Sequence, residues 1–199
     1  MQPFTKCTPF ALKEVTLQKL RLRYAADSYC KIIDFRTVKI IRVFGCPGAD
    51  ALFAELSKST TLPEKLESLE VKHTDNVESD GLDALEGFLC LIFGITALTL
   101  DFTDSKRIPP AASIVRHGRT LKKLNVHART SPDSGDDELV YDYVSFAWIC
   151  NDCLLLEQIS IAFSQVSVIC NQNEASETCS VCENPTDYNP PVHRASSTA

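Results

Sequence analysis

A short apolar motif, apolar-x-x-apolar-x-apolar, recurs along the chain. Its last two apolar positions alternate with variable ones, as in a strand with one buried face. Six copies begin at Leu17, Phe35, Leu66, Ile95, Leu121 and Leu156. The starts are separated by 18, 31, 29, 26 and 35 residues, so the pattern predicts an internal repeat of uneven length. The short first interval indicates either a degenerate first turn or a hairpin-like cap formed with the segment near Phe35.

Segments with helical spacing lie between the later copies. The first is expected to begin near Ala51, with Asp50 as its N-cap. Two more follow Gly81 and Pro110, since glycine and proline mark turns and helix starts. Residues 139–153 predict a fourth helix, whose apolar positions are Val140, Val144 and Trp148, with Ile149 as a further candidate.

Alternating strands and helices predict an α/β fold. We expect a short, irregular leucine-rich-repeat solenoid, with parallel strands on the concave face and helices on the convex face. It spans residues 10–169, and the polar, proline-containing residues 170–199 are expected to form a disordered tail. A compact α/β domain with a parallel sheet would show the same alternation, but the fixed two-then-one spacing favours the solenoid.

The ends of such a solenoid need polar capping repeats, because uncapped ends expose apolar edges. The N-terminal side shows no such cap. At the C-terminal end, Leu155, Leu156 and residues 161–163 are expected to be exposed.

Composition narrows the possible partners. Apolar residues make up 44% of the chain and the net charge is −6, which is typical of a soluble globular protein and argues against binding nucleic acid or an anionic membrane. The longest apolar run, residues 88–95, is too short to cross a bilayer. Residues 1–25 contain no signal peptide, so we expect an intracellular location, cytoplasmic or nuclear.

The repeats resemble the irregular leucine-rich-repeat regions of F-box-like proteins, especially the divergent fungal ones. The most characteristic stretch runs from Ile114 through His117 and Thr120 to Val126, and Leu62 to Leu69 looks similar. The resemblance covers roughly residues 10–165 and implies a substrate-receptor type of repeat domain. Only about ten residues precede the first repeat, so the F-box itself is not expected, and direct binding of a cullin-ligase adaptor is not expected either.

Motifs for catalysis are not found in the sequence. It contains no Gly-x-Ser-x-Gly, GxGxxG, GxxxxGK or HExxH, so we expect neither catalytic residues nor a cofactor. Two CxxC pairs, Cys150 with Cys153 and Cys179 with Cys182, have spacing suited to zinc. Cysteine also fills core positions, and because that reading is preferred no metal site is expected.

Surface recognition is the remaining role. The variable positions of the strand motif should face outward on the concave side and form a ladder that contacts another protein. These positions are Lys19, Arg21, Arg36, Lys39, Glu70, Lys72, Thr99, Asp101, Asn125, His127, Gln158 and Ser160. The early positions are basic and the later ones neutral or mixed, which would suit an acidic partner.

The sequence therefore favours a non-catalytic protein-binding scaffold. Two alternatives stay open: a small compact α/β enzyme with polar residues converging at the strand ends, and a fragment of a longer F-box protein.

Overall fold

The computed structural model describes residues 8–74, 81–130 and 138–163. The chain divides into two units, Met1–Val166 and Ser167–Ala199, and all described residues belong to the first. The tail expected at 170–199, with Cys179 and Cys182, lies outside the described residues.

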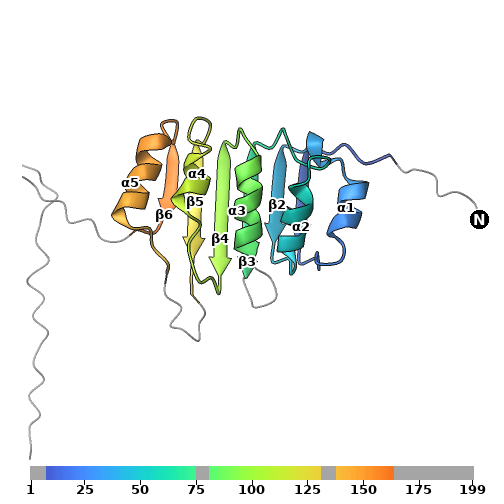
Figure 1. The fold of residues 1–199 in the computed structure, drawn as a ribbon, viewed down its shortest axis with the longest axis horizontal. Helices are drawn as coiled ribbons and strands as arrows, with labels where there is room; N and C mark the ends of the chain where they lie inside the picture. Colours follow the sequence, from blue (N-terminus) through green and yellow to red (C-terminus); the bar gives the residue numbers. More distant parts are fainter. Residues whose placement is uncertain (1–7, 75–80, 131–137, 164–199) are drawn as a thin grey trace, which may run out of the picture. The chain divides into compact units, whose positions relative to one another are not determined.

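Six parallel strands form one sheet, in the same order as in the sequence (Figure 1). They are β1 Glu14–Gln18, β2 Ile40–Phe44, β3 Ser68–Thr74, β4 Ala97–Thr103, β5 Lys123–Ala128 and β6 Gln158–Ile161. Each of the first five is followed by a helix before the next strand begins: α1 Ala26–Ile32, α2 Ala49–Leu56, α3 Gly81–Leu91, α4 Ala111–Val115 and α5 Tyr143–Asp152. A short 3-10 helix, η1 Phe35–Thr37, precedes β2.

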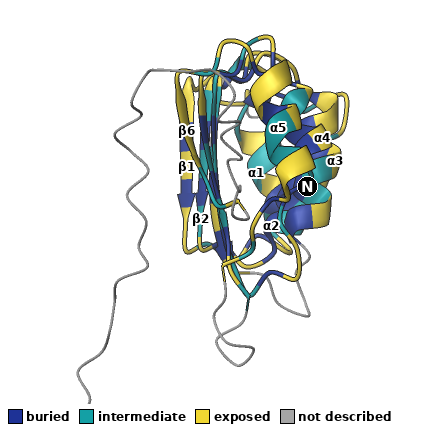
Figure 2. Cartoon of the chain, turned by 90° about the vertical axis from the view of Figure 1, so that its left-hand side faces the viewer, coloured by how far each residue is buried: buried dark blue, intermediate teal, exposed yellow. Residues whose placement is uncertain are grey.

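The helices pack on one face of the sheet and leave the other face free of helices (Figure 2). The predicted α/β class with parallel strands is therefore confirmed. The interval between the first two motifs contains the helix α1, so neither the hairpin-like cap nor the degenerate turn forms there.

Strand pairing corrects the first two copies of the motif. Val15, Ile41, Leu69, Leu98, Leu124 and Ile159 occupy equivalent positions in successive strands. The structural copies thus begin at Leu12 and Val38, because Leu17 is the last apolar position of β1 and not the first. With this register the repeats are separated by 26, 28, 29, 26 and 35 residues, and the anomalous first interval disappears.

The core lies between the sheet and the helices. Two rows of inward side chains cross the strands, and in β1 to β5 every member is buried: Val15, Ile41, Leu69, Leu98 and Leu124 in one row, and Leu17, Val43, Val71, Leu100 and Val126 in the other. The helices cover these rows, and Phe53 of α2 packs on Phe88 of α3 with ring centroids 5.5 Å apart. Burial of each such side chain contributes roughly 1.5–3 kcal/mol.

One backbone contact repeats at the start of every strand. The Lys13 carbonyl accepts hydrogen bonds from the amides of Lys39 and Ile40, at 2.8 and 3.1 Å. The carbonyls of Lys39, Glu67, Thr96 and Lys122 each accept two amides of the next strand in the same way. Every repeat thus begins with the same paired donors, although its length varies.

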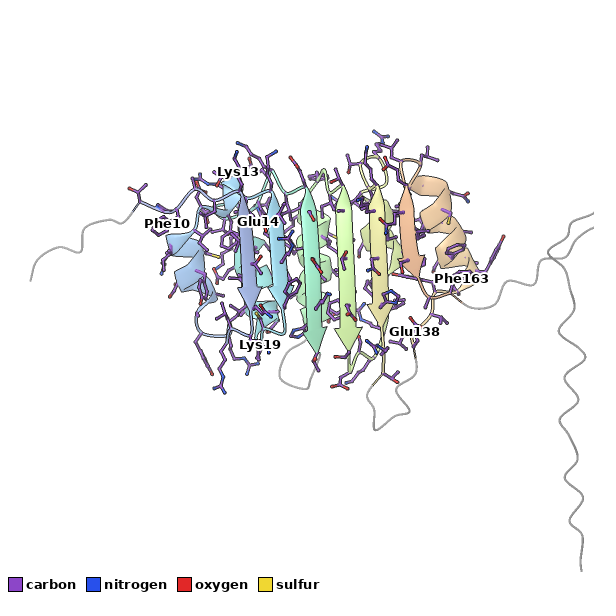
Figure 3. The ribbon with its side chains drawn as sticks, turned by 180° about the vertical axis from the view of Figure 1, so that it is seen from behind. Phe10, Lys13, Glu14, Lys19, Glu138 and Phe163 are labelled. Carbon is purple, nitrogen blue, oxygen red and sulfur yellow. The ribbon has the colours of Figure 1, made fainter. Side chains whose placement is uncertain are left out.

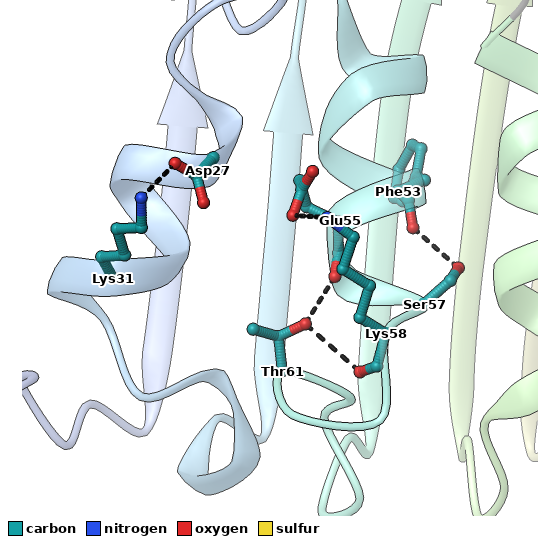
Figure 4. Close-up of polar contacts among 7 residues, drawn as sticks. All are labelled: Asp27, Lys31, Phe53, Glu55, Ser57, Lys58 and Thr61. Atoms are coloured by element: carbon teal, nitrogen blue, oxygen red, sulfur yellow. Dashed lines mark hydrogen bonds and ion pairs between the residues drawn. The ribbon is translucent and has the colours of Figure 1, made fainter.

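The start of α2 differs from expectation. Gly48, with a φ of 83°, is the N-cap of α2, and Asp50 lies within the first turn. Only glycine fits at Gly48, because an added Cβ would lie 2.3 Å from the Arg23 backbone nitrogen. At the other end of α2, Ser57 donates to the Phe53 carbonyl at 2.7 Å and Thr61 donates to the Glu55 carbonyl at 2.5 Å (Figure 4). Both carbonyls also accept a backbone amide, from Ser57 and Lys58 respectively.

In α5 the predicted inward face is wrong. Val140, Val144 and Trp148 are exposed, whereas Ile149 is buried. Asp142 is the N-cap of α5, and its side chain accepts the Ser145 amide at 2.6 Å. None of the helices in the described ranges has the length and apolar character needed to cross a membrane.

Candidate binding surface

The helix-free face of the sheet carries the outward side chains of all six strands (Figure 3). Alternation along each strand dictates this, because every second side chain points away from the helices. None of these outward positions is fully buried. From β1 to β6 they are Glu14, Thr16 and Gln18; Ile40, Arg42 and Phe44; Ser68, Glu70, Lys72 and Thr74; Ala97, Thr99, Asp101 and Thr103; Lys123, Asn125 and His127; Gln158 and Ser160.

The middle of the face is one cross-strand row. In register it contains Thr16, Arg42, Glu70, Thr99, Asn125 and Ser160. Polar side chains thus run across six neighbouring strands on a rigid backbone, which holds them at fixed separations of roughly 5 Å. We call the helix-free face with this row at its centre the ladder face.

Charges on the β1 to β3 part of the ladder face are paired with each other. Arg42 contacts Glu14, and its Nε lies 3.5 Å from Glu70. Lys72 lies 3.5 Å from Glu70 and its Nζ is 5.6 Å from the centre of the Phe44 ring. Two basic and two acidic side chains therefore neutralise each other in this region.

Eight of the predicted ladder residues lie on this face as expected: Glu70, Lys72, Thr99, Asp101, Asn125, His127, Gln158 and Ser160. The other four, all of them basic, do not. Lys19, with a φ of 53°, and Arg21 follow the end of β1. Arg36 lies in η1 beside Asp34. Lys39 precedes β2 and pairs with Glu67 at 2.5 Å.

The predicted basic gradient is therefore wrong, and the reason is the register error in the first two copies. Sequence reasoning also missed Glu14, Thr16 and Arg42. The signal for them was present, since Leu12-x-x-Val15-x-Leu17 and Val38-x-x-Ile41-x-Val43 fit the same motif at near-constant spacing.

A hydrogen-bonded group lies at the β5–β6 side of the ladder face. His127 Nδ1 is 3.0 Å from a Glu138 carboxylate oxygen, and Nε2 is 3.2 Å from the Ser160 hydroxyl. Next to it, Arg129 lies 3.9 Å from Asp101. The order serine, histidine, carboxylate is that of a nucleophile, base and orienting acid. However, His127 and Glu138 are 37% and 49% exposed, whereas such catalysis relies on a site from which water is excluded.

The buried histidines lie away from this group. His73 and His117 are almost fully buried, and burial lowers the pKa of each, which favours the neutral imidazole. His73 packs edge-on against Phe102 of the neighbouring strand, with ring centres 6.2 Å apart. Both side chains belong to the core and not to an exposed site.

Within residues 8–74, 81–130 and 138–163, no group of three or more Cys, His, Asp or Glu side chains is placed so that it could bind a metal ion. Within the CxxC pair of α5, Cys150 is exposed and Cys153 is buried. Burial, with Asp152 nearby, raises the pKa of the Cys153 thiol to about 11. Cys153 is thus a protonated core residue.

A hollow of about 240 Å³ lies at the amino-terminal edge of the sheet, lined by Lys39, Glu64, Lys65, Leu66, Glu67, Phe93 and Gly94. Ligands of parallel α/β sheets bind at the carboxyl ends of the strands. This hollow is at the opposite edge, and its Lys39 and Glu67 side chains already form an ion pair.

Comparison of the chain with protein-family models, with curated proteins and with solved structures finds no match.

Proposed function

We propose that this chain is a non-catalytic protein-binding module that contacts its partner through the ladder face. The observation that carries the proposal is the uninterrupted polar row from Thr16 to Ser160 across six strands held in register. Such a row offers many weak, evenly spaced contacts, which suits an extended protein surface better than a small molecule.

Repeat architecture supports the same proposal. The motif recurs at intervals of 26–35 residues, each interval of β1 to β5 contains one helix, and the strands add in sequence order. These are properties of a leucine-rich-repeat solenoid, a fold that typically binds proteins through an extended face. The resemblance to the repeat region of F-box-like proteins suggests a substrate-receptor role for this face.

A pull-down with two matched variants tests the proposal. Thr99→Arg places a long charged side chain at the centre of the ladder face, whereas Ala112→Arg places the same side chain on the exposed side of α4. The tagged full chain is incubated with source extract, and captured proteins are quantified by mass spectrometry. We expect a stoichiometric partner with the unchanged chain and with Ala112→Arg, and loss of that partner with Thr99→Arg. Equal capture by both variants would contradict binding at this face.

A second candidate function rests on Ser160, His127 and Glu138. If these residues form a hydrolytic group, Ser160 is the nucleophile, His127 the base and Glu138 the orienting acid. A fluorophosphonate probe, which labels activated serines, separates the two functions. Labelling that disappears in Ser160→Ala would establish the enzyme, whereas an unlabelled chain with an intact fold favours the binding module.

A further inference from the structure

Within the part of the chain that the structure describes, the two outer strands of the sheet each have a neighbouring strand on one side only. Among the described residues, β1 pairs only with β2, and β6 pairs only with β5. All strands are parallel, so the free edge of β6 has the geometry to accept a β1 strand from a second copy, as each inner strand accepts its successor. An unpaired edge is a template for such pairing.

Apolar side chains are exposed around β6. Ile159 points to the helix side and is 41% exposed, unlike the buried residues at the same position in β1 to β5. Further exposed apolar side chains at this end are Val140, Tyr143, Val144, Trp148, Leu154, Leu155 and Phe163. At the other end of the sheet, Phe10, Leu12, Tyr24 and Ile32 are exposed. Figure 3 shows Phe10 and Phe163 at opposite ends of the sheet. Exposed apolar side chains thus occur at both ends of the sheet, where burying them against another surface would be favourable.

Charge distinguishes the two ends. Residues 138–163 contain four acidic side chains and no lysine, arginine or histidine: Glu138, Asp142, Asp152 and Glu157. Residues 8–36 contain six basic side chains against three acidic ones, the basic ones being Lys13, Lys19, Arg21, Arg23, Lys31 and Arg36. Two C-terminal ends would repel each other, whereas a C-terminal end and an N-terminal end attract each other.

The register predicts which charges meet. The residue before each strand forms a row with Lys13, Lys39, Glu67, Thr96, Lys122 and Glu157. Within this row Lys39 pairs with Glu67 at 2.5 Å and Lys122 with Glu157 at 3.1 Å. A β1 strand continuing the sheet beyond β6 would place its Lys13 next to Glu157, so that a lysine and a glutamate are again neighbours in this row, here with the glutamate on the preceding strand. The Glu157 carbonyl would then accept two amides of the incoming strand, as the five carbonyls before it do.

We infer that this chain associates head to tail, with β1 of one copy extending the sheet beside β6 of the next. Such a contact is heterologous, since two different surfaces meet, and it produces open chains of growing length instead of closed dimers.

A charge exchange in the full chain tests this inference. Glu157→Lys and Lys13→Glu each place like charges opposite each other at the contact, whereas in an equimolar mixture of the two variants every contact between unlike copies has opposite charges. Lys106→Glu, an exposed lysine in the loop after β4, is the matched control. Sedimentation velocity over a concentration series at low salt measures the average mass, and circular dichroism confirms that every variant is folded.

We expect the average mass of the unchanged chain and of Lys106→Glu to rise with concentration. For Glu157→Lys alone or Lys13→Glu alone, the concentration needed to reach the same average mass should be higher by about tenfold or more, because repulsion replaces an ion pair. The mixture should return to the behaviour of the unchanged chain. A chain that stays monomeric at every attainable concentration would overturn the inference. Association that Lys13→Glu leaves unchanged would also overturn it, because the contact would then be a symmetric one between C-terminal ends or would use another surface.

Discussion

At the N-terminal end of the sheet, Val15 and Leu17 of β1 are 5% and 4% exposed, whereas Ile159, the equivalent of Val15 in β6, is 41% exposed. Both strands are outer strands, so their position in the sheet does not explain the difference. The helices do. β1 is followed by α1, while β6 is the last described strand and is followed by no described helix. The comparison teaches that the inward side chains of a strand in this fold are covered mainly by the helix that follows it.

This asymmetry also corrects an expectation from the sequence. The N-terminal side shows no polar capping repeat, yet its core positions are buried, because Leu22, Ala26 and the remainder of the α1 segment pack over them. At the C-terminal end the expectation is confirmed for Leu155 and Phe163, which are exposed, while Leu156 and Ile161 are half-buried.

The largest difference in stability is expected between alanine substitutions at equivalent positions in the middle of the sheet and in β6, at its C-terminal end. Leu98→Ala, at the position in β4 equivalent to Ile159, removes an almost fully buried side chain and should lower the free energy of unfolding by about 2–5 kcal/mol. Ile159→Ala removes one that water already reaches, and should cost about 1 kcal/mol or less. Denaturant unfolding monitored by circular dichroism measures both. Equal losses would mean that Ile159 is covered in solution and that the two ends are alike.

A smaller loss of stability is expected from a substitution that disturbs the packing of the segment leading into α1 at the N-terminal end. Gly48→Ala combines a positive φ with a Cβ that meets the Arg23 backbone, so Arg23 and the segment leading into α1 must move. Gly94→Ala has a similar φ of 82° but open space around its Cβ. We expect Gly94→Ala to cost about 1 kcal/mol for the backbone conformation alone and Gly48→Ala clearly more. If thermal unfolding shows equal losses, the close approach of Arg23 to Gly48 does not exist in solution.

Sequence reasoning predicted the middle of the molecule better than its ends. From Leu66 onward the motifs that begin at Leu66, Ile95, Leu121 and Leu156 coincide with the strands β3 to β6. Near the N-terminus, apolar residues at Leu12, Val15, Leu17, Leu20 and Leu22 allow two overlapping frames. Only cross-strand pairing selects between these frames, and pairing is a tertiary property that local spacing does not contain.

In the candidate site, too, local spacing predicted some features, whereas others depend on tertiary contacts. Eight ladder residues followed from strand alternation once the frame was right. The contact of Glu138 and Ser160 with His127 did not, because 11 and 33 residues separate them from it in the sequence. The inward face of α5 was also not predictable, since apolar residues occur around most of the helix and its phase depends on packing against α4.

Buried His73, in β3 near the centre of the sheet, should make the stability of the fold depend on pH. Burial lowers the pKa of His73 in the folded state, and Asp50 opposes this only in part. The unfolded chain therefore binds a proton more readily, so stability is complete above the unfolded pKa of 6.5 and falls as the pH drops below it. We expect His73→Leu to weaken the loss of stability between neutral pH and pH 5, by at most about 1.4 kcal/mol per pH unit. Denaturant unfolding at both pH values checks this; an unchanged pH dependence would show that His73 is accessible to water.

The smallest effect concerns α5, the helix next to the C-terminal end of the sheet. Asp142 caps it by accepting the Ser145 amide at 2.6 Å, whereas the N-cap residue of α1, at the N-terminal end of the sheet, is Ala25, which provides no side-chain cap. An exposed helix with few buried residues depends on its cap more than a helix held by packing. Asp142→Ala should lower the melting temperature by about one to a few degrees and should speed hydrogen exchange of α5 amides before those of β3 and β4. Asparagine is also a good N-cap residue, so Asp142→Asn should retain most of the stability. Equal loss in both variants would show that the charge of Asp142 matters and that its hydrogen bond to Ser145 does not.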